Sequence, residues 1–180
     1  MTDDELMARA ATGDRDAVRV LVERWERPIF SFMESMLGSP EEAQDVTQET
    51  FLRLCQHASR YRAEGHFKSW LFRIAGNLAR NKLKRRKIIR WVSLELHHDR
   101  RFTGEGPDEM LERKEASEAV CLALLRLPER QRQALLLRHY EDMSQTEVAY
   151  AMNATVSAVE TLLYRAMQGL RTQLLRGRCA

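Results

Sequence analysis

Apolar residues recur along this 180-residue chain with the three- and four-residue spacing of amphipathic helices, and no segment keeps the alternation of a strand. A clear helix start lies at Ser39, where Pro40 suits the first helical position and Glu42 completes the spacing of a capping box. The inward stripe of this predicted helix consists of Val46, Thr50, Phe51 and Leu54. The pattern predicts an all-α protein.

Two more helical segments flank this one. Residues 15–37 read as one or two helices, with Pro28 as a kink or break. The loop 60–66 contains the breaker Gly65, and another helix begins at Phe67. That helix is predicted to bury Phe67, Leu71, Ile74, Ala75 and Leu78. Its opposite stripe is Arg73, Asn77, Arg80, Asn81 and Lys84.

The helical period is lost over residues 88–110, which contain Gly104, Gly106 and Pro107. This stretch is typical of a linker. We therefore expect two small helical domains joined by a flexible linker. The expected divisions are 1–90 for the first domain, 91–114 for the linker and 115–180 for the second domain.

The second domain is a run of short helices. Ser144 and Glu147 are spaced as a capping box, and Asn153 lies where a tight turn needs a left-handed residue. Ser157 and Glu160 repeat the capping-box spacing before the last helix. Two helices joined by such a turn, with their apolar faces inward, predict a helix-turn-helix.

Composition places the chain among soluble globular proteins, at 44% hydrophobic and 31% charged residues. It has neither an apolar run that could cross a bilayer nor the pattern of a signal peptide, so we expect a cytoplasmic protein without membrane insertion. The three cysteines form no C-x-x-C pair, so no metal or other cofactor is expected, and Cys55 and Cys121 are predicted to be buried. Motifs of catalytic sites are lacking too, so we expect no enzyme.

Charge is distributed unevenly along the chain. Residues 1–60 carry a net charge of −5, residues 61–103 a net charge of +9, and residues 104–180 a net charge of −1. The positive middle is typical of a surface that binds a polyanion. The acidic first third would repel one, so it is expected to face another partner.

The polar stripe of the helix that begins at Phe67 is the first candidate nucleic-acid surface. Asn77 and Asn81 can each donate to and accept from a base edge, and the cations 84–87 would attract phosphates. The alternative is that the asparagines only keep one helix face solvated. The aromatic residues nearby, which could stack a base or pack in the core, are Tyr61, Phe67, Trp70 and Phe72, and for Phe67 we expect the core.

The outer face of the last helix is the second candidate surface. The N-terminal residues of such a helix contact base edges in the major groove. The candidates are Ser157, Thr161, Tyr164, Arg165 and Gln168. Glu160 could accept a hydrogen bond from a cytosine amino group, or it could only close the capping box with Ser157.

Three stretches resemble the bacterial extracytoplasmic-function (group 4) sigma factors of RNA polymerase. They are "EEAQDVTQETFLRL", "FKSWLFRIAGNLARNKLKRRK" and "LRLPERQRQALLLRHYEDMSQTEVAYAM". The resemblance covers residues 10–90, similar to the σ2 domain, and about 115–175, similar to the σ4 domain. It implies a promoter-specificity subunit that docks on core RNA polymerase, reads promoter DNA and has no enzymatic activity of its own.

The resemblance also assigns roles to residues. Asp45, Gln48 and Glu49 would contact the β′ coiled coil of the polymerase. A base flipped out of the −10 element would be held by the loop 62–66, and the helix after it would read that element. The expected −10 contacts are Arg62, His66, Arg73, Asn77, Arg80, Asn81, Lys84 and Arg85.

The σ4 domain would bind the −35 element as duplex and contact the β flap of the polymerase. The expected −35 contacts are Ser157, Glu160, Thr161, Tyr164 and Arg165. Many members of that family carry basic residues where Glu160 and Leu162 stand, so the −35 preference stays open. The family usually works under an anti-sigma factor, which is the further partner expected.

Two other hypotheses compete with a sigma factor. One is a free-standing helix-turn-helix regulator that uses the basic middle segment as a nonspecific anchor. It would bind duplex DNA without polymerase. The other is a sigma-like decoy for an anti-sigma factor, which would not need the intact stripe of Asn77 and Asn81.

Overall fold

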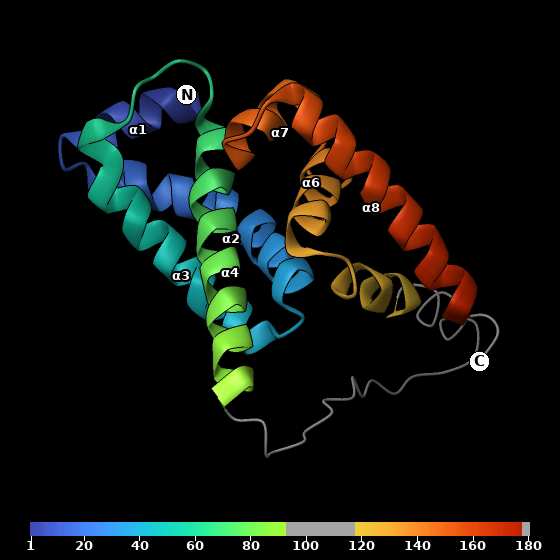
Figure 1. Ribbon diagram of the computed structural model, residues 1–180. Helices are drawn as coiled ribbons and strands as arrows, with labels where there is room; N and C mark the ends of the chain where they lie inside the picture. The colour runs from blue at the N-terminus through green and yellow to red at the C-terminus, as the bar shows by residue number, and fades with distance from the viewer. Residues whose placement is uncertain (93–117, 178–180) are drawn as a thin grey trace, which may run out of the picture.

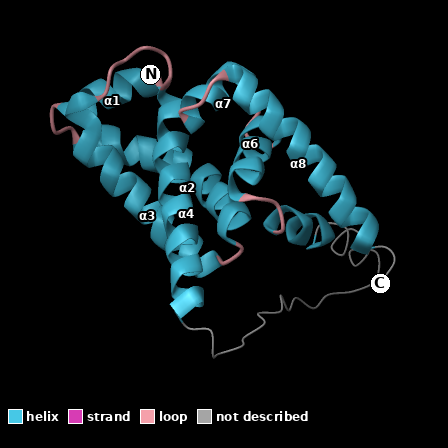
Figure 2. Ribbon diagram, in the orientation of Figure 1, coloured by secondary structure: helices cyan, strands magenta, loops and turns pink. Residues whose placement is uncertain are grey.

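The computed structural model describes residues 1–92 and 118–177, and every regular element within these two ranges is helical (Figure 2). The all-α prediction is confirmed. The elements are α1 (Asp3–Ala11), α2 (Arg15–Leu37), α3 (Pro40–His57), the short 3-10 helix η1 (Ala58–Arg60), α4 (Phe67–Val92), α6 (Glu129–His139), α7 (Gln145–Met152) and α8 (Val156–Gly177). Residues 118–125 are also helical.

The first half of the chain is a bundle of α1 to α4 (Figure 1). α2 packs against both α3 and α4, and α1 lies against α2 and η1. Its largest fully buried side chains are Met7, Leu21, Ile29, Met33, Met36, Leu54, Leu71 and Phe72. The predicted inward stripe of α3 is confirmed, because its four side chains are all buried.

Pro28 does not break the chain into two helices. α2 runs without interruption from Arg15 to Leu37 with Pro28 inside it, so the alternative of two helices was wrong. A proline inside a helix costs about 3 kcal/mol. The apolar stripe of α2 continues on both sides of it, with Leu21 and Ile29 wholly buried, and their burial offsets that cost.

Helix starts follow local cap chemistry. The N-cap of α3 is Ser39, as predicted, and its side chain accepts the amide N–H of Glu42. The Glu42 carboxylate does not return to the cap, as a capping box would require, but binds the guanidinium of Arg86 on α4. The Glu42 carboxylate therefore forms an ion pair with a distant helix, and it does not make the capping hydrogen bond that the local pattern predicted. The acidic N-terminal stretch, for which no element was predicted, forms α1 with a capping box of Thr2 and Glu5.

The second half contains the predicted helix-turn-helix, made of α7 and α8. Ser144 and Glu147 form the predicted capping box of α7, and Asn153 ends it in the left-handed region with φ of 49°. The second capping box was wrong. α8 begins at Val156, and the hydroxyl of Thr155 accepts the amide N–H of Ala158, so Ser157 already lies inside the helix.

The end of α4, the burial of two cysteines and the linker were also predicted from the sequence. α4 continues to Val92, two residues into the predicted linker 91–114, and no glycine or proline interrupts it there. Cys55 and Cys121 were predicted to be buried and are both exposed, since each faces outward between the apolar positions of its helix. Most of the predicted linker lies outside the described residues.

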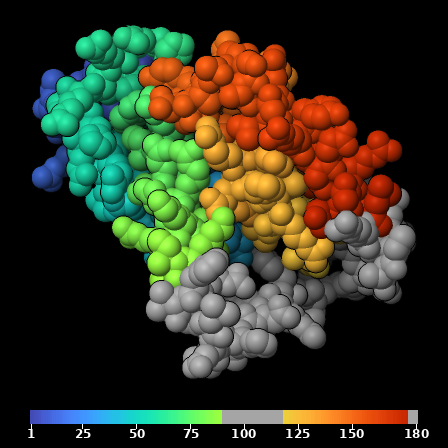
Figure 3. All heavy atoms as spheres, viewed as in Figure 1, coloured from blue at the N-terminus to red at the C-terminus, as the bar shows by residue number. Residues whose placement is uncertain are grey.

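The two halves are in contact. α4 and α2 of the first half pack against α7 and α6 of the second. Figure 3 shows the same contact in space-filling form, with α7 against the upper part of α4. α4 is therefore buried on two sides, against its own bundle and against the second half.

Candidate nucleic-acid interface

α4 presents Asn77 and Asn81 to solvent one helical turn apart. The guanidinium of Arg80 donates to Oδ1 of Asn77. Because a guanidinium carries only donors, the amide oxygen must face it, and the amide NH2 is left to donate. The Asn77 amide is therefore oriented by Arg80, with its NH2 group turned away from the guanidinium.

The cations that follow on α4 fall into two groups. Lys84 and Arg85 are exposed. Arg86 binds the carboxylate of Glu42 and also donates to the carbonyl of Leu37 at 3.0 Å, which ties α4 to the α2–α3 corner. Of the run 84–87, Lys84 and Arg85 thus face solvent, whereas Arg86 holds two parts of the bundle together.

The fourth cation of that run, Lys87, reaches across to the second half. Its Nζ lies 2.6 Å from the carboxylate of Glu129 at the start of α6. Its charge is therefore already matched while the two halves are in contact.

The loop before α4 brings His66 next to α7. Gly65 has φ of 75°, a left-handed conformation that favours glycine, and it turns the chain into the helix. Arg62 is exposed. The ring of His66 lies against the ring of Tyr150 on α7, with centroids 5.3 Å apart, and the guanidinium of Arg73 lies 5.9 Å from the centroid of the same tyrosine ring. Sequence reasoning did not single out Tyr150, because nothing local indicates what packs against it.

The aromatic cluster beside this loop packs as core. Phe67 and Phe72 are buried, as expected for Phe67, and the rings of Tyr61 and Trp70 meet edge to face at 4.9 Å. The hydroxyl of Tyr61 donates to Asp4 on α1. Burial, followed by this hydrogen bond, raises the pKa of Tyr61 above its ordinary value. The cluster therefore anchors the loop to α1.

The outer face of α8 is open. The predicted −35 contacts are all exposed: Ser157, Glu160, Thr161, Tyr164 and Arg165. Gln168 Nε2 lies 3.4 Å from the hydroxyl of Tyr164 and orders that part of the face. Since Thr155 caps the helix, Glu160 is not used as a capping residue, and its side chain is exposed.

A third surface lies on α3, beside α4 of the same bundle. Asp45 and Gln48 are exposed and Glu49 is partly exposed. The Asp45 carboxylate lies 3.6 Å from Nζ of Lys82, and Glu49 lies 2.8 Å from Nε of Arg53. Both ion pairs are at the surface, where such pairs contribute little to stability and can exchange for a partner's charges.

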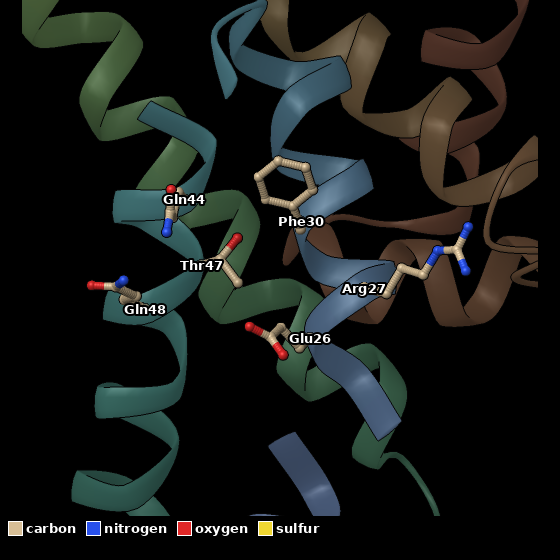
Figure 4. Close-up of a pocket in the computed structure, with 6 residues that line it drawn as sticks. All are labelled: Glu26, Arg27, Phe30, Gln44, Thr47 and Gln48. Carbon is tan, nitrogen blue, oxygen red and sulfur yellow. The ribbon is translucent and has the colours of Figure 1, made fainter. Parts of the chain in front are cut away.

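A hollow of about 320 Å³ adjoins this surface between α2 and α3 (Figure 4). Its lining residues are Glu26, Arg27, Phe30, Gln44, Thr47 and Gln48. Figure 4 shows Gln44, Thr47 and Gln48 on α3 across from Phe30 and Glu26 on α2, and polar groups beside an exposed aromatic ring are common at protein interfaces.

Comparison with known proteins identifies the family. Residues 21–88 match Sigma-70 region 2, and residues 117–170 match Sigma-70, region 4. The RNA polymerase sigma-H factor of Pseudomonas aeruginosa is 30% identical over 176 residues, which cover 93% of this chain and 91% of that protein. The ECF RNA polymerase sigma factor SigW of Bacillus subtilis is 28% identical over 170 residues, covering 90% of this chain and 91% of SigW. The chain belongs to the extracytoplasmic-function sigma factors, the promoter-specificity subunits of bacterial RNA polymerase.

Two solved structures share the fold. CnrH in complex with the cytosolic domain of CnrY is 27% identical, with a TM-score of 0.72 over 96% of each chain. The sigma factor RpoE of Bartonella quintana, in complex with the anti-sigma factor NepR, has a TM-score of 0.69 over 87% of this chain and 95% of RpoE, at 18% identity. Among the described residues no helix is long and apolar enough to span a membrane.

Proposed function

We propose that this sigma factor reads the opened −10 strand with α4 and the loop before it, and the −35 duplex with the outer face of α8. The supporting observation is the exposure of Asn77 and Asn81 on a face flanked by Lys84 and Arg85. The amides supply base-edge hydrogen bonds, whereas the cations supply attraction to phosphates that does not depend on sequence. The protein itself performs no chemistry, because the polymerase makes the RNA.

The two readers fit different forms of DNA. A helix-turn-helix such as α7–α8 inserts its second helix into the major groove of duplex DNA. A base of the −10 element becomes available for stacking and edge contacts only after strand separation, so a loop that holds it traps the melted state. We assign that capture to Arg62 and His66. The domain division that fits these roles is 1–90, 91–114 and 115–180.

The α3 surface is the proposed docking site for the β′ coiled coil. Asp45, Gln48 and Glu49 lie there beside the hollow between α2 and α3, on the most acidic part of the chain. The second half would contact the β flap. A subunit of this enzyme would work in the cytoplasm. We further propose a polypeptide partner of the anti-sigma class, on the basis of family membership.

The deciding experiment is a footprint on promoter DNA with and without core polymerase. A sigma factor protects and opens its promoter only with core enzyme and supports a transcript from it. Protection of duplex DNA by the chain alone, with no transcript when core is added, would instead favour the free-standing regulator.

Docking is tested by the double variant Gln48→Ala, Glu49→Ala. We expect it to lose core binding by about tenfold or more, because truncating interface residues typically costs 1 kcal/mol or more at each important position. Arg53→Ala is the matched control, since it removes the partner of Glu49 on the same helix and leaves the proposed contacts. Normal holoenzyme assembly by the double variant would remove the docking assignment.

A further inference from the structure

The one acidic residue of α8 lies on the face that we propose for the −35 duplex. Glu160 is the fifth residue of this helix, and its side chain is exposed. A helix-turn-helix inserts the N-terminal part of its second helix into the major groove, between two rows of phosphates. A carboxylate in that position is repelled by DNA of any sequence. Its presence there is favourable only if a particular base compensates the repulsion.

The packing of α8 fixes the direction in which Glu160 leaves the helix. Val159 and Ala166 are fully buried, on the side where α8 packs against α6 and α7 (Figure 1). Neighbouring residues of a helix point about 100° apart, so Glu160 is turned away from the buried side on which Val159 lies. The carboxylate therefore leaves the helix beside the proposed DNA contacts Ser157 and Thr161.

No cation of the protein compensates this carboxylate. The positions three and four residues away on the helix are uncharged, and they are Val156, Ser157, Leu163 and Tyr164. Arg165 is five positions away, about 140° further around the helix. In the described part of the chain Glu160 makes neither an ion pair nor a hydrogen bond through its side chain, whereas Glu129 and Glu141 pair with lysines of α4. Both carboxylate oxygens of Glu160 are thus open to an outside partner.

The polar neighbours of Glu160 are partly used within the helix. The hydroxyl of Thr161 donates to the backbone carbonyl of Ser157 at 3.0 Å. Nε2 of Gln168 lies 3.4 Å from the hydroxyl of Tyr164. These bonds hold the neighbouring side chains in place. Glu160 presents two acceptor oxygens beside them and no donor, so the group that it recognises must be a donor.

The major groove offers two such donors, and they are not equivalent. Cytosine presents its N4 amino group and adenine its N6 amino group, whereas guanine and thymine present acceptors that repel a carboxylate. The adenine amino group lies between two acceptors, its own N7 and O4 of the paired thymine. The cytosine amino group has a single acceptor beside it, O6 of the paired guanine. Cytosine is therefore the base that a carboxylate accepts best.

We propose that Glu160 selects a cytosine in the −35 element and lowers binding to sequences that lack it at that position. This inference rests on the proposed function, because it requires α8 to enter the duplex. Repulsion from phosphates acts on any DNA, whereas the hydrogen bond from N4 forms only on the matching sequence. Glu160 thus increases discrimination between promoters and does not increase affinity for DNA in general.

An exchange of base preference tests the assignment. Holoenzyme is supplied with a library of randomised promoters, and the transcribed sequences are read. Wild type should enrich cytosine at one position of the distal block by about fivefold or more over each other base. Glu160→Gln should change that position to adenine, because a glutamine amide pairs with both N6 and N7 of adenine. Glu160→Ala should lose the preference there and keep the rest of the block.

Binding to two templates separates a base contact from simple repulsion. One template carries the selected cytosine, and the other carries thymine in its place. Holoenzyme with Glu160→Ala should bind the cytosine template more weakly than wild type does and the thymine template more strongly, so that the ratio of the two affinities falls by about fivefold or more. An equal gain on both templates would show that Glu160 only repels phosphates, and would overturn the proposal.

Arg171→Gln is the control, since Arg171 is exposed on a later turn of α8 and should leave the base preference unchanged at every position. Alanine and glutamine are good helix formers, so equal helix content in the Glu160 variants checks that α8 is intact. A distal block that Glu160→Gln leaves unchanged would overturn this inference and leave the proposed function standing. Failure of wild type to enrich any distal block would refute the proposed role of α8 itself.

Discussion

Single residues on α4 divide into the proposed contacts with DNA and the residues that support them. Asn77 is exposed, so Asn77→Ala should change the free energy of unfolding by less than about 0.5 kcal/mol. Promoter discrimination at the −10 element should weaken by about 1–3 kcal/mol, because one base-edge contact is lost. Urea unfolding and competition between matched and mismatched promoters measure the two quantities. Unchanged discrimination would remove Asn77 from the reader.

Arg80 is a positioning residue in this account. Its guanidinium fixes the amide of Asn77 through Oδ1. Arg80→Lys retains the charge but not the planar fork of donors, so it should relax −10 specificity while changing the salt dependence of binding little. Arg80→Gln, which loses the charge as well, should lower both the −10 specificity and the salt dependence of binding. Equal behaviour of the two variants would show that Arg80 acts only as a charge.

The cap of α7 gives a prediction on pH. The hydroxyl and then the backbone N–H of Ser144 hold the pKa of Glu147 below its usual range. A lowered folded-state pKa adds stability above the unfolded-state value of about 4.3, and that stability is lost as the pH falls through the folded-state value. The difference in stability between wild type and Glu147→Gln should therefore shrink as the pH falls from 6 to about 3.

Serine substitutions check both cap assignments. Ser144→Ala should destabilise the protein by about 0.5–2 kcal/mol, the usual cost of losing an N-cap. Ser157→Ala should have little effect, because Thr155 caps α8 and Ser157 lies within the helix. Thermal unfolding monitored by helix content measures both. A larger loss in Ser157→Ala than in Ser144→Ala would contradict the structure of the turn.

At the scale of the element, α4 combines the proposed phosphate contacts with anchoring of the bundle. Lys84→Gln and Arg85→Gln should each reduce the slope of the logarithm of the promoter-binding constant against the logarithm of the salt concentration by about 0.7–0.9. Arg86→Gln should instead lower stability, since Arg86 binds Glu42 and the carbonyl of Leu37. Binding titrations from 50 to 200 mM salt test the slopes. A slope that responds equally to all three changes would contradict this division.

Local rules predicted the elements well where one local signal was decisive. The capping box at Ser144 and the left-handed Asn153 depend on residues within one turn, so the sequence contains them in full. At the start of α8, Thr155 and Ser157 are both good caps, and spacing alone does not choose between them. In the structure Val159 is buried in the core, and the helix begins at Val156, directly after Thr155.

The second buried face of α4 was harder to predict. Ser69, Gly76 and Ala79 are all buried, although the predicted inward stripe contained none of them. Their small size is a signal of close helix packing, but it does not say which helix approaches. Contacts such as Lys87 with Glu129 join residues more than forty positions apart, and only the folded chain brings them together.

At the scale of the whole molecule, the halves should move apart when the ionic pairs between them weaken. A closed chain of 180 residues has an expected radius of gyration of about 16 Å. Raising salt screens Lys68–Glu141 and Lys87–Glu129, so small-angle scattering should report a larger radius at 1 M than at 0.05 M salt. Gly76→Leu, which adds a side chain where α4 and α6 approach closely, should be expanded at both concentrations. A radius that is identical under all these conditions would contradict a reversible contact.

The family and the exposed asparagine stripe together make one central claim: α4 reads the bases of an opened −10 element. The most direct test is transcription in vitro with core polymerase on a library of randomised promoters, comparing wild type with Asn77→Ala. We predict that wild type enriches two sequence blocks, and that the variant relaxes the block nearer the start site while leaving the distal block intact. An unchanged near block in the variant, or no enrichment by wild type, would contradict the account.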